Sequence, residues 1–264
     1  MYNFEYHRPS SVAEAASLLA GTEDAKLLAG GQTYIPTLKQ RLAKPSAVID
    51  LSGIGELKGI KEEASGVTIG AMTTHGEVAH SEAVKRVIPG LAELAGMIGD
   101  PAVRNTGTIG GSVSNNDPAA DYPGAIVALG ATVRTNKREI PGESFFLGMF
   151  ETALEPDEII TAVHFPKPEK SKYTKFRHPA SRYAMAGAFV AKTSGGIRVA
   201  ITGAGPCVFR STDMEQALSQ NFSASALDGI TVDPSGLNSD IHGSSEYRAH
   251  LVKVMAKRAV EALA

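Results

Sequence analysis

Cysteine is almost absent from this sequence, because Cys207 is the single one among 264 residues. One thiol cannot form a disulfide within the chain. An iron–sulfur cluster takes about four thiolates, so any such cluster must lie in another chain. We expect Cys207 to be a small buried hydrophobic side chain that follows the apolar run at residues 199–201.

The sequence also lacks an excess of charge of either sign. It has 26 Lys and Arg against 28 Asp and Glu, a formal net charge of −2 at pH 7, and no basic run. Nucleic acids and anionic membranes attract clustered positive charge, so neither partner is expected. No apolar stretch reaches the roughly 18 to 20 residues that cross a bilayer, and residues 1–20 lack the features of a signal peptide. We therefore expect a cytoplasmic protein without membrane insertion.

What the sequence does contain is glycine, and enough length for more than one domain. At about 100 to 200 residues per domain, 264 residues predict roughly two domains with their own cores. The 27 glycines are clustered rather than evenly spread. Clustered glycine indicates loops in which the backbone takes positive φ or lies close to a ligand.

The first 55 residues alternate predicted strands with predicted helices. We predict strands at residues 3–7, 26–29 and 47–51, a serine-capped helix that ends near residue 19, and a helix at residues 34–42. This βαβαβ order predicts a small α/β unit in which the second and third strands are neighbours.

From residue 57 the pattern changes to short strands and two helices. The strands are expected at residues 57–62, 66–71, 131–135 and 139–140, and the helices at 75–79 and 90–98. Thr74 and Glu77 have the spacing of a helix capping box. Residues 99–123, rich in Gly, Pro, Asp and Asn, predict a long polar loop, and such loops are usually functional.

A break with two prolines and several charges at residues 165–170 predicts a domain boundary near residue 168. Strands are expected beyond it at residues 173–177, 186–193 and 197–204, with a hairpin turn at 194–196, and a helix at 244–264. The last part is therefore predicted to be an antiparallel sheet covered by helices. The chain as a whole belongs to the α+β class.

Two glycine-rich loops carry the strongest functional signal. Residues 29–33 lie between a strand and a helix, where backbone N–H groups and the helix dipole form an anion cradle, although Gly-Gly before a helix is often only a turn. Residues 107–112 repeat the pattern, and two facing cradles suit a dinucleotide. Neither loop has P-loop or Rossmann spacing. Asp117 and Asp121 offer carboxylates for ribityl or ribose hydroxyls, but Asp117 has the alternative role of an Asx-turn before Pro118.

Three motifs together resemble a known family. They are Ala29-Gly30-Gly31-Gln32-Thr33-Tyr34-Ile35-Pro36, Gly70-Ala71-Met72-Thr73-Thr74-His75, and the segment from Val103 through Gly107-Thr108-Ile109-Gly110-Gly111-Ser112 to Asp117-Pro118-Ala119-Ala120-Asp121-Tyr122-Pro123. They resemble the FAD-binding medium subunit of the carbon monoxide dehydrogenase and xanthine dehydrogenase family of molybdenum hydroxylases, over essentially the whole chain. The resemblance implies a vanillyl-alcohol-oxidase (PCMH) type FAD domain at 1–168, with subdomains at about 1–55 and 56–168. A flavoprotein C-terminal domain follows at 169–264.

The resemblance also implies which residues hold the cofactor. The pyrophosphate contacts are expected on the backbone of Ala29, Gly30, Gly31, Gln32 and Thr33, completed by Thr108, Ile109, Gly110, Gly111 and Ser112. Valine at Gly31 or Gly110 is therefore expected to abolish FAD binding while much of the fold remains intact.

Five further positions follow from the resemblance. Asp121 matches a residue that binds FAD hydroxyls, and Ile160 matches an apolar contact to the cofactor. Tyr183 matches the residue that packs over one face of the isoalloxazine ring, and Arg177 lies where relatives carry a cation near the flavin. Arg182 departs from the family, which usually has Asp there, so we expect altered hydrogen bonding and redox tuning of the flavin.

The implied function is electron transfer by non-covalently bound FAD, with no catalytic residue and no metal on this chain. Electrons would come from [2Fe–2S] clusters on a small subunit, the molybdenum cofactor would lie on a large subunit, and the assembly would be a dimer of heterotrimers. Fittingly, the sequence lacks a Gly-x-Ser-x-Gly elbow, a His-Glu-x-x-His motif and a Cys pair, and His75 and His80 do not share a helix face. The alternatives are a stand-alone FAD-dependent oxidase or dehydrogenase of the same fold, and a non-catalytic adaptor whose glycine loops are only turns.

Overall fold

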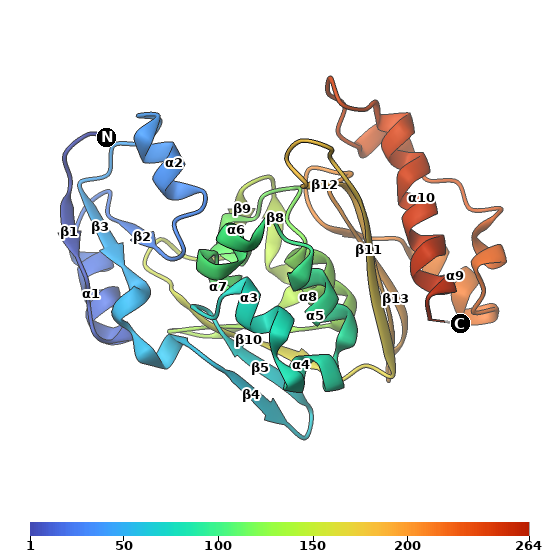
Figure 1. The fold of residues 1–264 in the computed structure, drawn as a ribbon, viewed down its shortest axis with the longest axis horizontal. Coiled ribbons are helices and arrows are strands. Elements are labelled where there is room, and N and C mark those ends of the chain that lie inside the picture. The colour runs from blue at the N-terminus through green and yellow to red at the C-terminus, as the bar shows by residue number, and fades with distance from the viewer. Residues whose placement is uncertain (264) are drawn as a thin grey trace.

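Within residues 1–263, three β-sheets of three, five and four strands follow one another along the chain with their helices, and a separate two-stranded ribbon lies in the middle part (Figure 1). The structure, a computed structural model, describes residues 1–263. Helices and strands mix in all three parts, so the fold is α+β. Within these described residues, no helix combines the length and the apolar character needed to cross a bilayer.

The N-terminal part is the predicted βαβαβ unit. Its elements are β1 (Glu5–His7), α1 (Val12–Gly21), β2 (Lys26–Leu28), α2 (Tyr34–Lys39) and β3 (Ala47–Asp50). The sheet is parallel in the order β1-β3-β2, which confirms that the second and third strands are neighbours. The Ser11 side chain accepts a hydrogen bond from the Glu14 N–H and so caps α1 as predicted. Buried Ala15, Ile49 and Leu57 contribute to the small core of this part.

The middle part contains a five-stranded antiparallel sheet in the order β4-β5-β10-β6-β7. Its strands are β4 (Ile60–Glu63), β5 (Gly66–Gly70), β6 (Thr132–Thr135), β7 (Glu139–Pro141) and β10 (Ile160–Pro166), and a two-stranded ribbon adds β8 (Phe146–Gly148) and β9 (Glu151–Thr152). The first predicted strand begins three residues late, because η2 (Gly55–Leu57) forms a 3₁₀ turn after η1 (Leu51–Gly53). The central strand β10 was not predicted, and it pairs with β5 and β6.

Six helices, counted within residues 1–263, lie between β5 and β6 in the chain. They are α3 (His75–His80), α4 (Glu82–Val87), α5 (Pro89–Gly96), α6 (Pro101–Thr106), α7 (Ile109–Asn115) and α8 (Tyr122–Leu129). Of these, α4, α7 and α8 pack on this sheet. Thr74 and Glu77 form the predicted capping box of α3, with both reciprocal hydrogen bonds present. The prediction of a long polar loop at residues 99–123 was wrong. Side-chain caps from Asp100 and Thr108 begin α6 and α7, and the polar residues of this segment serve as helix ends.

The C-terminal part is the predicted antiparallel sheet with helices. Its strands, in the order β11-β12-β13-β14, are β11 (Lys170–Arg177), β12 (Ala184–Thr193), β13 (Gly196–Thr202) and β14 (Phe209–Arg210). Its helices are α9 (Thr212–Gln220) and α10 (Ser245–Glu261), and two short 3₁₀ helices, η4 (Ala224–Leu227) and η5 (Pro234–Gly236), lie between them. Another 3₁₀ helix, η3 (Gly142–Ser144), belongs to the middle part. The division at residue 168 falls in the short connection between β10 and β11.

Strand β12 is buried on both faces along its first eight residues. Helices α9 and α10 cover one side of its sheet, and α5 and α8 of the middle part lie on the other side (Figure 1). Both faces of the sheet therefore need apolar side chains, which explains the nearly continuous apolar run in β12. Cys207 is half-buried at the edge of the middle core rather than fully buried.

Candidate functional site

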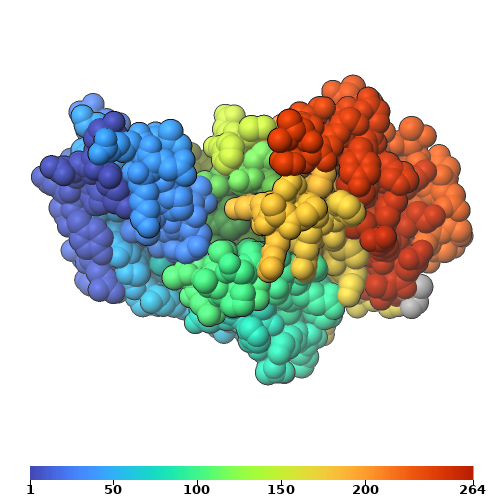
Figure 2. Space-filling model, turned by 45° about the horizontal axis from the view of Figure 1, so that its top comes forward, coloured from blue at the N-terminus to red at the C-terminus, as the bar shows by residue number. Residues whose placement is uncertain are grey.

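A cavity of about 840 Å³ lies where the three parts of the chain meet. Figure 2 shows the molecule hollowed between the blue N-terminal part and the gold segment around residue 180. Most residues that line the cavity come from four stretches of the chain, 26–37, 98–121, 158–160 and 175–183, and Leu51, Ala71, Met72, His75 and Leu154 complete the lining. Its volume is within the range of about 300–1,000 Å³ that ligand sites occupy.

The first glycine loop, between β2 and α2, offers hydrogen-bond donors to this cavity. Within residues 1–263, the five consecutive backbone N–H groups of residues 30–34 donate no hydrogen bond to the protein. No side chain caps α2, and Gly31 has φ +71°. Successive free amides at the start of a helix attract an anion such as a phosphate. The loop therefore fits the pyrophosphate of a dinucleotide.

The second glycine loop contributes in a different way from the one expected. Its amides at the start of α7 are already hydrogen-bonded within the protein. The bonds join Ile109 N to Thr73 O (3.1 Å), Gly110 N to Ala71 O (2.8 Å), Gly111 N to Thr108 Oγ1 (3.1 Å) and Ser112 N to Thr108 O (3.0 Å). Thr108, Gly110, Gly111 and Ser112 line the cavity, whereas Ile109 is fully buried in the middle core and does not. This loop thus presents hydroxyl groups and backbone surface rather than free amides.

The two loops face each other closely, as two cradles for one ligand would. A Cβ atom added at Gly30 would overlap the Thr106 carbonyl oxygen and lie 2.7 Å from Gly107 Cα. A Cβ atom on Gly111 would lie 3.3 Å from Ala29 Cβ. Glycine at these positions allows the close approach of two backbones.

The expectation for valine at Gly110 needs correction. An added Cβ atom there would lie 2.7 Å from the Ala71 carbonyl oxygen, against the end of β5. The glycine thus serves the packing of α7 on the sheet, and valine would disturb the fold itself. At Gly31 the added atom would meet the end of the Ile35 side chain, 2.5 Å away, which can move. The positive φ of Gly31 is the larger obstacle to substitution.

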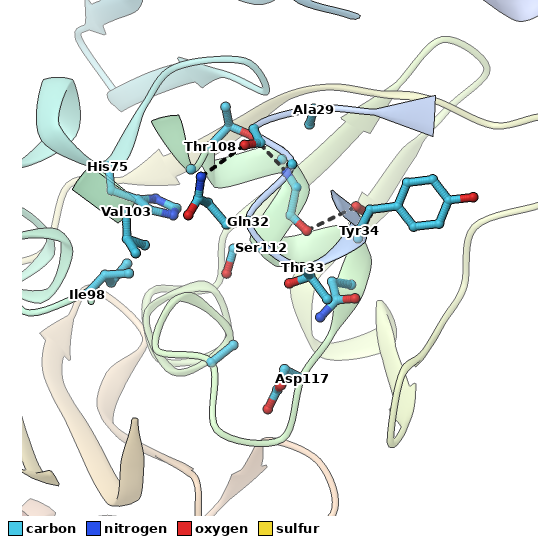
Figure 3. A pocket seen from close by; sticks show the side chains of 18 of the residues that line it. Ala29, Gln32, Thr33, Tyr34, His75, Ile98, Val103, Thr108, Ser112 and Asp117 are labelled. Atoms are coloured by element: carbon cyan, nitrogen blue, oxygen red, sulfur yellow. Dashed lines mark hydrogen bonds between the residues drawn. The ribbon is translucent and has the colours of Figure 1, made fainter. Parts of the chain in front are cut away.

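The two predicted carboxylates differ in what they can offer a ligand. Asp117 lines the cavity (Figure 3). One of its oxygens accepts the Ala119 N–H at 2.8 Å, so the Asx-turn alternative is present. Asp121 is buried, and both of its oxygens are engaged, one by the Tyr173 hydroxyl and the other by Lys175 Nζ at 2.7 Å. Burial raises the pKa of the Asp121 carboxyl, while the Lys175 ammonium and the Tyr173 hydroxyl oppose that shift.

Several cavity residues were missed by sequence reasoning. The Lys175 side chain is only 1% exposed and lines the cavity, on the same face of β11 as buried Tyr173 two residues earlier. That period-two spacing was the signal that could have placed the Lys175 side chain inward.

His75, Ile98 and Val103 gather at one side of the view in Figure 3. Burial, with a smaller effect of Arg104, lowers the pKa of His75 to about 4, so its ring is neutral at pH 7.

Of the remaining residues expected to contact the cofactor, some line the cavity and one does not. Ile160 and Tyr183 line the cavity, the first buried and the second half exposed, and Arg182 lines it beside Tyr183. Arg177 is exposed at the end of β11 and is not part of the lining, whereas buried Lys175, two residues earlier, is. Residues 175 and 177 would share a face in a regular strand, but the pairing of β11 with β12 is irregular between Phe176 and Arg177.

Comparison with known proteins gives a consistent result. Residues 2–168 match the family model described as the FAD binding domain in molybdopterin dehydrogenase. The chain is 37% identical to the carbon monoxide dehydrogenase medium chain of Hydrogenophaga pseudoflava, covering 98% of this chain and 96% of that one. It is 30% identical to the xanthine dehydrogenase FAD-binding subunit of Escherichia coli O157:H7, over 98% and 96% of the two chains.

A solved structure agrees with these sequence relationships. The reconstituted carbon monoxide dehydrogenase from Oligotropha carboxidovorans has a chain that superposes with a TM-score of 0.90 at 35% identity, covering 98% of this chain and 96% of that one. These matches establish that this chain belongs to the family of FAD-binding domains of molybdopterin dehydrogenases, an oxidoreductase component whose cofactor is FAD.

Proposed function

We propose that this chain is the FAD-carrying electron-transfer subunit of a molybdenum hydroxylase complex. It would accept electrons from [2Fe–2S] clusters on a small partner subunit and pass them to an external acceptor. The molybdenum cofactor would lie on a large partner subunit, and the complex would be a cytoplasmic dimer of heterotrimers. The observation that carries the proposal is the row of five backbone amides without a protein acceptor beside a cavity of dinucleotide size. Similarity to medium subunits of named multi-subunit dehydrogenases supports it.

The residues around the cavity have separable tasks in this proposal. The amides of residues 30–34 would hold the pyrophosphate, and the hydroxyls of Thr108 and Ser112 would donate further hydrogen bonds to it. The free oxygen of Asp117 would accept a hydroxyl of the ribityl chain or ribose. Ile98, Val103 and Ile160 would exclude water from the apolar parts of the cofactor. FAD itself, when bound, takes up electrons singly and releases them singly or in pairs.

The division of the chain follows the same proposal. Residues 1–168 would form the FAD-binding domain and residues 169–264 the flavoprotein C-terminal domain. The cavity is bordered by both, because Lys175 and residues 180–183 come from the second. The C-terminal domain would therefore complete the cofactor site rather than bring a separate substrate site.

Native purification of the chain with its companions tests the proposal directly. We expect one FAD per chain, released intact by acid because hydrogen bonds and packing would hold it, and iron and molybdenum in the companion chains. FAD without iron or molybdenum would instead favour a stand-alone oxidase or dehydrogenase. A colourless chain that takes up no FAD, alone or with its partners, would leave only the adaptor alternative.

Tyr183→Ala is expected to keep the cofactor and change its surroundings. One aromatic contact contributes only about 1 kcal/mol beyond its buried area, so FAD affinity should fall by less than about tenfold. The half-exposed ring lies at the rim of the cavity, so the variant should admit solvent and O₂ to the flavin. We expect a shifted reduction potential and faster reoxidation. Tyr247→Ala, at an exposed tyrosine of the same domain outside the cavity lining, is the control. A lower melting temperature with unchanged potential and reoxidation would leave Tyr183 only a packing role.

A further inference from the structure

The turn between β11 and β12 is built around the ring of His178. The imidazole Nδ1 accepts two backbone hydrogen bonds, from Ala180 N at 3.2 Å and from Ser181 N at 3.1 Å. The backbone of His178 closes the same turn, because its N–H donates to Tyr183 O at 2.8 Å and its carbonyl accepts from Arg182 N at 2.9 Å. Four hydrogen bonds on one residue therefore shape residues 178–183.

This turn forms part of the wall of the FAD cavity. Ala180, Ser181, Arg182 and Tyr183 line the cavity, and Arg182 takes a left-handed φ of +63° to place Tyr183 there. On its other side the turn borders a second cavity of about 280 Å³, which His178 lines. A change in the shape of the turn therefore changes the cavity wall that residues 180–183 form.

The two amide donors determine the protonation state of the ring. A nitrogen that accepts hydrogen bonds from two N–H groups cannot carry a proton, so the imidazole is neutral, with its proton on Nε2. Histidine side chains change charge between about pH 5 and pH 8. A proton on Nδ1 would turn an acceptor into a donor that faces two donors, and both hydrogen bonds would be lost.

The charged and titratable groups around His178 come from four elements. His242, on the turn before α10, packs edge-on against the His178 ring at 4.2 Å between centroids. Asp240 of that turn is ion-paired with buried Arg248 of α10 at 2.7 Å, so its charge is already compensated. Asp117 borders the same cavity from the segment after α7, and the turn itself carries Arg182 and Tyr183, with Arg177 just before it.

We propose that His178 is a positioning residue for the flavin site: its neutral imidazole holds the turn that carries Tyr183 over the FAD cavity, and protonation releases that turn. The effect on FAD rests on the proposed function, whereas the behaviour of the turn does not. As the pH falls, the turn should lose its two side-chain hydrogen bonds, and Tyr183 should no longer be held over the cavity.

Amide hydrogen exchange of the full chain in its native complex tests the turn. The measurement is the protection of the peptide that contains residues 178–183, relative to the intrinsic exchange rate at the same pH. We expect wild-type protection to fall about fivefold or more from pH 8 to pH 5.5, as the loss of hydrogen bonds of ordinary strength predicts. His178→Asn should keep an acceptor for the same amides, as in an Asx-turn, and its protection should not depend on pH. His178→Ala should show low protection at both pH values.

His242→Asn is the matched control, because it removes the neighbouring ring and leaves the acceptor of the turn. The fall in protection should persist in this variant. Wild-type protection that is equal at both pH values would overturn the proposal. A fall that persists in His178→Asn but disappears in His242→Asn would also overturn it, because the titrating group would then be His242.

Quenching of flavin fluorescence by iodide links the turn to the cofactor. Quenching should increase from pH 8 to pH 5.5 in the wild type and remain constant in His178→Asn. If the turn titrates and the quenching does not change, His178 does not position the flavin cover. If the chain holds no FAD at all, the proposed function fails on flavin content, while amide exchange still decides the behaviour of the turn.

Discussion

Gly30→Ala is expected to reduce FAD affinity by about tenfold to a hundredfold. The added methyl group would overlap the Thr106 carbonyl oxygen and lie 2.7 Å from Gly107 Cα, so the two glycine loops must separate. Because these neighbours are backbone atoms, no side-chain rotation relieves the overlap. The amides of residues 30–34 would shift away from the pyrophosphate, and each charge-assisted hydrogen bond lost costs about 1.5–3 kcal/mol.

Isothermal titration of the FAD-depleted chain with FAD provides the measurement. Gly31→Ala should give a smaller loss, because the cost is mainly that of a positive φ and the Ile35 side chain can move. Gly55→Ala is the control, since a Cβ atom there meets nothing within 4 Å and φ is not positive. Wild-type affinity in Gly30→Ala would mean that the two loops can separate without disturbing the cradle.

Lys175→Met is expected to destabilise the fold by about 3–5 kcal/mol at pH 8. The Lys175 side chain is 1% exposed and Asp121 is 5% exposed, so the substitution leaves a buried carboxylate without its cation. The Tyr173 hydroxyl would remain as the hydrogen-bond donor to Asp121. Urea unfolding, monitored by circular dichroism on the purified full chain, gives the free energy of unfolding.

The loss of unfolding free energy in Lys175→Met should be smaller at pH 5 than at pH 8. Burial raises the pKa of Asp121, and without Lys175 only Tyr173 and more distant charges oppose that shift. The folded variant would then bind a proton at a higher pH than the unfolded chain does. Its stability therefore rises as the pH falls toward the ordinary carboxyl pKa of about 3.9. Adding Asp121→Asn should restore part of the stability and remove the pH dependence.

Lys172→Met on the same strand is the matched control. Lys172 pairs with Glu93 at 2.7 Å, but the two side chains are 28% and 45% exposed, so the change in unfolding free energy should stay within about 1 kcal/mol. A similar small effect for Lys175→Met would show that solvent reaches Asp121 and that the pair is not a buried structural element.

Features that depend on neighbouring residues could be predicted from the sequence. The βαβαβ unit, the capping box of Thr74 and Glu77, and the β12–β13 hairpin all follow from periodicity and caps within about ten residues. These signals are local, so the same residues produce them whatever the rest of the chain does.

Features that depend on distant partners were decided by the tertiary structure. The amides of Gly110 and Ile109 were predicted to be free for phosphate, but carbonyls more than thirty residues earlier accept their hydrogen bonds. Strand β10 became the centre of a sheet because β5 and β6 lie on either side of it. Hydrogen-bond donors look alike in the sequence whether or not a distant acceptor satisfies them.

The sequence by itself determined the family and the cofactor class. Only the tertiary structure decided which donors remain available, that Lys175 rather than Arg177 reaches the cavity, and that the Ile109 side chain turns into the core. The physical reason is the same in each case. Residue type sets what a group can donate, accept or bury, whereas its partners are set by the packing of segments far apart in the chain.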